Sequence, residues 1–215
     1  MNIGGKRLTP PNRYVAGTPV SYWLVPAAAD RLRLQQQIDA LANELKATSF
    51  EPHITLHTTH LADAEDPADH LAAVGEKLAP LRLECGGTGH SGMLFKTLFV
   101  DFSYQALAPL ATALRDRSRQ FSSFQLDPHL SLLYASLPSA TRQAVAEKLN
   151  MRGRMVRFSS LAAVIPGPGQ TGFQDIATWQ VCARHRLNGD VMISSLGQAQ
   201  LAQSQERPYT NDAKA

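Results

Sequence analysis

A five-residue string of proline, histidine, an apolar residue, a hydroxyl residue and leucine occurs twice in this chain of 215 residues. It reads PHITL at 52–56 and PHLSL at 128–132. Each copy has the period-2 alternation of a β-strand, in which successive side chains point to opposite faces. The histidine and the hydroxyl residue of each copy therefore share one face, and the apolar residues pack on the other.

Brought together, the two copies would place the imidazoles of His53 and His129 beside the hydroxyls of Thr55 and Ser131. Imidazole titrates near neutral pH, so one histidine can accept a proton from water while the other donates one to a leaving group. The hydroxyls can donate hydrogen bonds to phosphoryl oxygens. This set suits cleavage of a phosphodiester without a metal, and we expect no cofactor. It also predicts a bell-shaped pH dependence of kcat/KM with a maximum near neutrality.

The elements that must position these strings repeat as well. Hydrophobic periodicity and turn residues predict strands over 21–26, 51–58, 81–85, 94–102, 128–134, 156–164 and 179–187, and helices over 27–47, 67–79, 107–114 and 138–150. Both halves therefore read strand–helix–strand–helix–strand, with the histidine string on the second strand. We interpret this as an internal duplication, whose pseudo-two-fold axis would bring the two histidines across one cleft. The glycine-rich stretch 86–92 is predicted to be a flexible connector.

Composition sets broad limits on function. The formal net charge of +3 is a mild bias toward anions and not the dense basic stripe of a duplex-DNA binder. The sequence has no apolar stretch of membrane-spanning length, and its first twenty residues lack the apolar core of a signal peptide. We expect a cytoplasmic monomer with no membrane partner, in which Cys85 and Cys182 are free thiols.

Other residues suggest further sites that the pattern supports less well. The spacing of His53, His57 and His60 does not match the helical histidine pair of a zinc protease, so we expect no metal ligands there. His57 would border the cleft if its strand continues past the string. Four aromatic residues are candidates to stack against a nucleobase, although core packing is the commoner role of an aromatic residue: Trp23, Phe95, Phe173 and Trp179. Phe173 is the best loop candidate, because it follows the loop PGPGQTG.

The two strings, extended to PHLSLLY at 128–134, and the opening strand YWLVP at 22–26 resemble the two-histidine (2H) phosphoesterase superfamily. Within it, the similarity is greatest to the cyclic phosphodiesterase-like branch. The resemblance spans about residues 20–187. It implies an α+β, bilobal fold of duplicated βαβαβ halves, with antiparallel sheets and a pseudo-two-fold central cleft across which the histidines face each other.

The resemblance also implies roles for particular residues. It makes His53 and His129 the catalytic pair, Thr55 and Ser131 the phosphate-binding hydroxyls, and Tyr134 an active-site tyrosine. It implies hydrolysis of a 2′,3′-cyclic nucleotide or of ADP-ribose 1″,2″-cyclic phosphate to the monoester. It further suggests that His129 activates water and that His53 protonates the leaving oxygen.

Two alternatives stay open. An enzyme like the 2′-5′ RNA ligase branch would act on RNA 3′ ends, whereas the mild charge favours a small cyclic-phosphate nucleotide as the partner. A non-catalytic nucleotide-binding module would keep the cleft, but the intact set of histidines and hydroxyls argues against it. We predict an N-terminal arm over 1–20, one bilobal domain over 21–196 with lobes of about 21–90 and 91–195 that can interleave, and a polar tail over 197–215.

Overall fold

The computed structural model describes residues 14–93, 95–167 and 172–190, without the side chains of residues 173 and 174. Its strands are β1 (Pro19–Pro26), β2 (Ile54–His60), β3 (Leu81–Glu84), β4 (Gly87–His90), β5 (Leu98–Asp101), β6 (His129–Leu133), β7 (Met155–Ile165) and β8 (Gln180–Arg186). Its helices are α1 (Ala28–Glu44), α2 (Pro67–Gly75), α3 (Tyr104–Arg115), α4 (Ser139–Lys148) and the short 3-10 helix η1 (Phe173–Thr178). The predicted α+β class is confirmed.

All strand pairs are antiparallel and run in the order β3-β7-β1-β2-β6-β5-β4, with β8 also paired to β7. The sheet has two arms, which meet where β2 pairs with β6 through the single residue pair Ile54 and Leu130. These two residues hold the same position in the two histidine strings, so the sheet is joined on the pseudo-two-fold axis.

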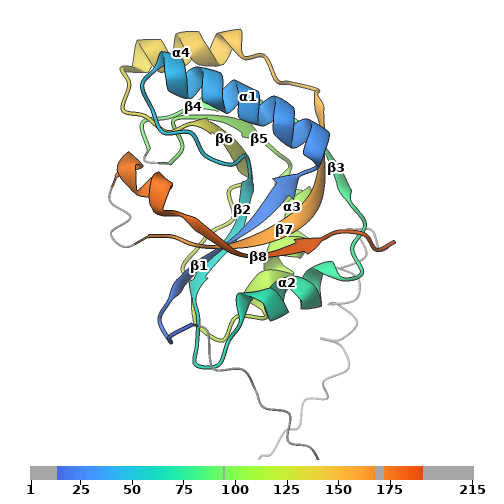
Figure 1. The fold of residues 1–215 in the computed structure, drawn as a ribbon. Helices are drawn as coiled ribbons and strands as arrows, with labels where there is room; N and C mark the ends of the chain where they lie inside the picture. Colours follow the sequence, from blue (N-terminus) through green and yellow to red (C-terminus); the bar gives the residue numbers. More distant parts are fainter. Residues whose placement is uncertain (1–13, 94, 168–171, 191–215) are drawn as a thin grey trace, which may run out of the picture.

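The last strand of the second half, β7, lies in the arm of the first half, and β4, which follows β3, lies in the arm of the second half. β3 pairs with the first residues of β7, while β4 pairs with β5 and the rest of β7 pairs with β1. The helices follow the same exchange, because α1 and α4 pack against the β6-β5-β4 arm, and α2 and α3 pack against the arm that holds β2, β7 and β8 (Figure 1). Each arm thus carries the first helix of the opposite half.

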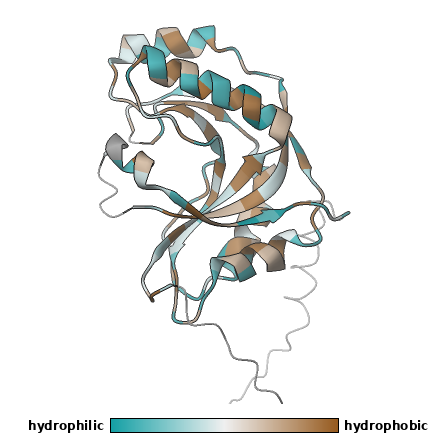
Figure 2. Ribbon diagram, in the orientation of Figure 1, coloured by the Kyte–Doolittle hydropathy of each residue, from teal (hydrophilic) through white to brown (hydrophobic). Residues whose placement is uncertain are grey.

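The helices form where apolar residues repeat with helical spacing. On α1, Leu34, Ile38 and Leu41 are buried, whereas the residues between them are mostly exposed. In Figure 2 this helix alternates hydrophilic and hydrophobic residues along its length, as an amphipathic helix does. Helix α3 begins after Ser103, whose hydroxyl accepts a hydrogen bond from the backbone N–H of Ala106 and caps the helix.

The glycine-rich connector prediction was wrong in part, because the structure forms β4 within it and pairs this strand with β5. A Cβ atom on Gly89 would lie 2.5 Å from the ring of Phe99 on the neighbouring strand. Glycine therefore permits a close approach of two strands here, which composition alone reads as flexibility.

Among the described residues, none of the helices has both the length and the apolar character needed to cross a membrane. Cys85 and Cys182 are free, as expected. The structure places the start of β1 at Pro19, and the predicted arm and tail lie largely outside the described residues. The domain boundaries stay a prediction.

Candidate active site

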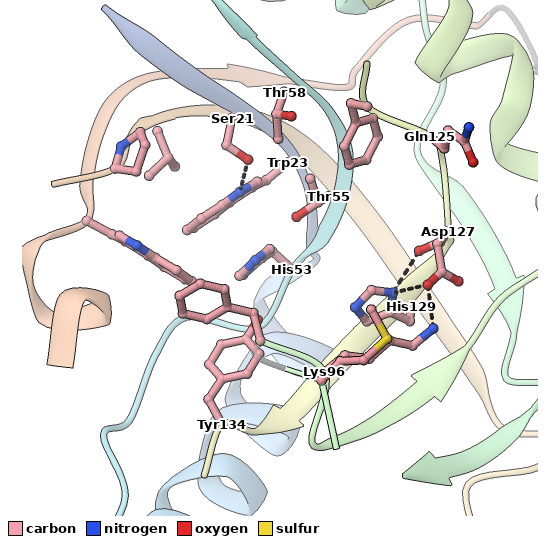
Figure 3. Close-up of a pocket in the computed structure, with 16 residues that line it drawn as sticks. Ser21, Trp23, His53, Thr55, Thr58, Lys96, Gln125, Asp127, His129 and Tyr134 are labelled. Atoms are coloured by element: carbon pink, nitrogen blue, oxygen red, sulfur yellow. Dashed lines mark hydrogen bonds and ion pairs between the residues drawn. The ribbon is translucent and has the colours of Figure 1, made fainter. Parts of the chain in front are cut away.

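One cavity of about 450 Å³ lies between the two arms of the sheet and holds both motif histidines. Figure 3 shows both side chains there, His53 from the residue before β2 and His129 from the first residue of β6. Thr55 also lines this cavity. Five aromatic side chains from separate parts of the chain complete much of its wall: Trp23, Phe95, Phe124, Tyr134 and Trp179.

The two imidazoles are oriented by the same backbone contact. Nδ1 of His53 lies 2.6 Å from the carbonyl oxygen of Glu51, and Nδ1 of His129 lies 2.7 Å from the carbonyl oxygen of Asp127. A carbonyl oxygen can only accept, so Nδ1 carries the proton in both rings. In the neutral form of each ring, Nε2 therefore has a free lone pair and can act as a base.

A β-bulge in β2 explains which side chains reach the cavity. Thr55 pairs with Trp23 and His57 pairs with Tyr22, so Leu56 is the extra residue. The expectation that His57 borders the cleft with His53 was wrong, because the bulge shifts the alternation by one residue. Thr58 lines the cavity in its place.

The bulge is duplicated in β6. Ser131 pairs with Phe99 and Leu133 pairs with Leu98, which leaves Leu132 as the extra residue. Tyr134 then turns toward the cavity at the position that Thr58 holds in the first copy. The bulge itself leaves no mark in the sequence, although Tyr134 was singled out through the family resemblance.

His53 lies among aromatic rings. Trp23 stacks on it with ring centres 3.6 Å apart and planes 8° apart, and Trp179 meets it edge-on at 6.0 Å. His53 is 5% exposed, and burial lowers its pKa from 6.5 to about 4. The imidazole is therefore neutral at pH 7.

Trp179 was one of the stacking candidates, with core packing expected as its commoner role. It follows η1 directly, and η1 begins at Phe173, whose side chain is outside what the structure describes. The sequence argument preferred Phe173 in this part of the chain, and it is Trp179 that lines the cavity. The predicted role of Phe173 stays a prediction, while Trp23 lies in the cavity as expected.

Tyr134 packs against Phe50, with ring centres 4.1 Å apart. Burial raises the pKa of Tyr134 well above its usual value of 10, so its hydroxyl stays protonated at neutral pH. Tyr134 thus lines the cavity as a neutral side chain.

His129 has charged neighbours. The Lys96 ammonium forms an ion pair with the Asp127 carboxylate, which lies 3.7 Å from Nδ1 of His129. Burial lowers the pKa of His129 and the Lys96 charge adds to this, whereas the Asp127 carbonyl and the carboxylates of Asp127 and Asp101 raise it. A single lysine in a predicted strand is most often a solvated charge, yet Lys96 lines the cavity and supplies positive charge there.

The two motif hydroxyls do not have equivalent positions. Thr55 lines the cavity, but Ser131 is buried, does not line it, and donates a hydrogen bond from Oγ to the carbonyl oxygen of Phe95 at 3.2 Å. Phe95 has a positive φ of 61°, which is unusual for a bulky residue. In this structure Ser131 therefore supports a strained loop and does not point into the cavity.

No group of three or more histidine, cysteine, aspartate or glutamate side chains is arranged to ligate a metal within the described parts of the chain. The cavity instead offers two imidazoles, hydroxyls of Thr55 and Thr58, and the ammonium of Lys96. These groups are suited to binding an anionic group and to moving protons around it.

Comparison with solved structures finds similarity to TT0787 of Thermus thermophilus, at 18% identity and a TM-score of 0.48, over 80% of this chain and 100% of that chain. The chain is also similar to E. coli LigT complexed with 3′-AMP (16% identity, TM-score 0.46, 80% and 99% covered) and to Kluyveromyces marxianus Usb1 (11%, 0.42, 81% and 99%). No family model matches the sequence, and no curated protein matches it. Similarities this distant say nothing about activity, which rests on the residues of the site.

Proposed function

We propose that this protein hydrolyses a small cyclic phosphodiester, a 2′,3′-cyclic nucleotide or ADP-ribose 1″,2″-cyclic phosphate, to a phosphomonoester. The observation that carries the proposal is the shared cavity of His53 and His129, each held through Nδ1 so that Nε2 is available for proton transfer. A metal-independent reaction needs one base and one acid, and these two imidazoles supply both.

The surroundings of the two histidines favour an assignment of base and acid that is opposite to the one that the family resemblance suggests. His53, with a pKa of about 4, is the neutral base that takes a proton from water through Nε2. Burial lowers the pKa of His129 as well, but the carboxylates of Asp127 and Asp101 favour its protonated form, so His129 is the acid that protonates the departing ribose oxygen. The water oxygen bonds to phosphorus, the phosphorus–ribose oxygen bond breaks, and solvent restores the two protonation states.

The remaining lining residues provide binding. Thr55 can donate to a non-bridging phosphoryl oxygen, and the Lys96 charge favours the anion. Trp23 and Trp179 present ring surfaces beside His53, where a nucleobase or an adenine group could stack. The role of Ser131 in phosphate binding stays a prediction, and it requires the Ser131 hydroxyl to leave the Phe95 carbonyl.

The experiment is a turnover assay with 2′,3′-cyclic nucleotides and ADP-ribose 1″,2″-cyclic phosphate in the presence of EDTA. We expect hydrolysis, with ³¹P NMR identifying which monoester forms and hence which bond is cleaved. Binding of these compounds without turnover would reject the enzyme and leave a nucleotide-binding module. Turnover that EDTA abolishes would reject the metal-independent mechanism.

A second candidate substrate is an RNA 3′ end with a terminal cyclic phosphate. A further cavity of about 390 Å³ continues from the first and shares with it Ser21, Thr58, Phe124 and Pro166. Phe121, which is 90% exposed, stands at this outer cavity and could stack against a second base. Comparing kcat/KM for a cyclic mononucleotide and a short oligonucleotide ending in the same group decides between the two substrates.

A further inference from the structure

The Asp127 carboxylate is shared by a lysine and a histidine of the active-site cavity. Its Oδ2 atom forms an ion pair with the Lys96 ammonium and lies 3.7 Å from Nδ1 of His129. Figure 3 shows these three side chains together, and all of them line the cavity. The lysine is charged at neutral pH, whereas the imidazole is charged only when it is protonated. One carboxylate oxygen therefore serves a permanent charge and a conditional one.

Lys96 is held in the cavity wall by a second contact besides this ion pair. Its Nζ atom lies 4.3 Å from the centre of the Phe99 ring, and its side chain is 16% exposed. Phe99 in turn meets the His129 ring edge-on at 5.6 Å. Within the part of the chain that the structure describes, Asp127 is the one carboxylate that forms an ion pair with Lys96. A phosphate group that enters the cavity would compete with Asp127 for the ammonium, because both present anionic oxygens as acceptors.

The charges that face His129 come from four parts of the fold. They are carried by Asp127 on the same segment, Asp101 opposite it on β5, Lys96 before β5, and His53 across the cavity. Burial and the Lys96 charge lower the pKa of His129, whereas the two carboxylates raise it. In the free protein, Lys96 offsets the Asp127 carboxylate, and the imidazole that the proposed reaction uses as an acid is mainly neutral at pH 7.

We propose that substrate binding moves the Lys96 ammonium from Asp127 to the phosphate, which frees the Asp127 carboxylate to stabilise the imidazolium form of His129. The inference rests on the proposed hydrolysis, in which His129 is the acid. Lys96 binds the substrate, whereas Asp127 is a positioning residue that acts through His129. The proton comes from solvent and binds to Nε2, because Nδ1 already carries one. The Asp127 side chain is 59% exposed, so water can solvate its carboxylate once Lys96 has left.

The test is an NMR titration of the His129 imidazole in the full chain, without and with a saturating 3′,5′-cyclic nucleotide. This probe carries a singly charged phosphodiester but is not one of the proposed substrates. The pKa of His129, whose signal is assigned by its loss in His129→Gln, should rise by about one unit or more when the probe binds. No rise at any probe concentration, through lack of binding or lack of exchange, would overturn the proposal.

Turnover of a 2′,3′-cyclic nucleotide, assayed separately, keeps this result apart from the proposed hydrolysis. A raised pKa of His129 without turnover would reject the hydrolysis and retain the exchange of Lys96 between the two anions. Turnover without a raised pKa would reject the exchange and retain the hydrolysis.

Two variants separate the exchange from the direct effect of the probe's own charge. In the free protein, Lys96→Gln should raise the pKa of His129 and Asp127→Asn should lower it, and in both the rise on binding should be smaller than in the unchanged protein. Lys96→Arg keeps the charge and should retain the full rise. Lys148→Gln removes the same charge from an exposed position on α4, outside the cavity lining, and is the matched control. Equal rises in the unchanged protein, Lys96→Gln and Asp127→Asn would overturn the proposal, because the charge of the probe alone would explain them.

The kinetic readout is a difference between two pH profiles. The profile of kcat/KM reports the pKa values of the free protein, and that of kcat reports those of the complex with substrate. The exchange predicts that the basic limb of kcat lies about one unit or more above the basic limb of kcat/KM. In Asp127→Asn this separation should shrink, because no carboxylate is released beside His129. Coinciding limbs in the unchanged protein would contradict the exchange.

Discussion

The two copies of the histidine string share a backbone and differ in what surrounds it. Both have the same Nδ1-to-carbonyl contact, both have a bulge three residues after the histidine, and both meet at the Ile54–Leu130 pair. Around His53 the neighbours are aromatic rings, whereas around His129 they are charged side chains.

Equivalent positions show how the difference arises. Trp23 and Phe99 pair with Thr55 and Ser131 on corresponding strands, but Trp23 stacks flat on its histidine while Phe99 meets His129 edge-on at 5.6 Å. A large ring lying flat on an imidazole excludes water from one whole face. The edge-on phenylalanine leaves His129 with 20% of its side chain exposed.

The acidic residues two positions before the histidines also differ. The Glu51 carboxylate is held by Arg31 and Arg184, at 3.2 and 2.5 Å. The Asp127 carboxylate pairs with Lys96 and remains near His129. Duplication thus supplies matched geometry, and divergence of the neighbours moves the two pKa values apart, which is how one cleft can hold both an acid and a base.

The largest effect is expected when either histidine of the active-site pair is replaced. His53→Ala and His129→Ala should each lower kcat by about 10²–10⁴-fold, because each deletes a general acid or base. Steady-state kinetics on a cyclic nucleotide measures both. His90→Ala, on β4 and away from the cavity lining, is the control and should retain normal turnover. Near-normal kcat in either of the two active-site variants would show that the cleft does not use a histidine pair.

The two motif hydroxyls give the next largest contrast. Thr55→Ala should lower kcat/KM by about 10–10³-fold, the range for loss of a donor to a developing oxyanion. Ser131→Ala should lower it less, and should instead cost about 0.5–1.5 kcal/mol of unfolding free energy through the lost hydrogen bond to Phe95. Kinetics and urea denaturation of both variants separate the roles. An equal kinetic loss would mean that Ser131 turns into the cavity when substrate binds.

The pH profile tests whether the divergent surroundings set the protonation states. Activity requires neutral His53, so it is lost as pH falls through about 4, and it requires protonated His129, so it is lost as pH rises through a pKa below 6.5. The maximum of kcat/KM should therefore lie on the acid side of neutrality, and not near pH 7 as the sequence alone predicts. The two limbs report macroscopic values for the pair. A maximum of kcat/KM above pH 7 would contradict the requirement for neutral His53 and protonated His129.

The sequence was sufficient for the parts of the molecule that depend on local pattern. The doubled string predicted the strands, the cavity-facing position that His53 shares with Thr55, and the meeting of both histidines in one cavity. Leu107, Leu110 and Leu114 marked α3 because helical packing repeats every three or four residues.

The sequence was insufficient where tertiary contacts override local pattern. The bulges at Leu56 and Leu132 insert one residue without any glycine or proline to signal them, and they decide that His57 leaves the cavity. Lys96 and Trp179 enter the site because distant segments fold over it, which no spacing reveals. Strand β4 has glycine at position 89 because a Cβ atom there would collide with the Phe99 ring on the neighbouring strand.

The smallest expected effect is on the pKa of His53 itself. Trp23→Ala should expose one face of the imidazole and raise the pKa of His53 by about one unit, worth about 1.4 kcal/mol between its two protonation states. The acid limb of kcat/KM should move up by the same amount. Phe99→Ala, the corresponding change in the other copy, should shift the pKa of His129 less, because charges as well as burial set that value.

Trp23→Phe gives the first copy the aromatic residue of the second, and the pKa of His53 in this variant should lie between those of the unchanged protein and of Trp23→Ala. Imidazole NMR signals followed from about pH 3 to 8 measure all three variants over the range that brackets these pKa values. Equal shifts in Trp23→Ala and Phe99→Ala would mean that the two aromatic neighbours do not account for the difference between the copies.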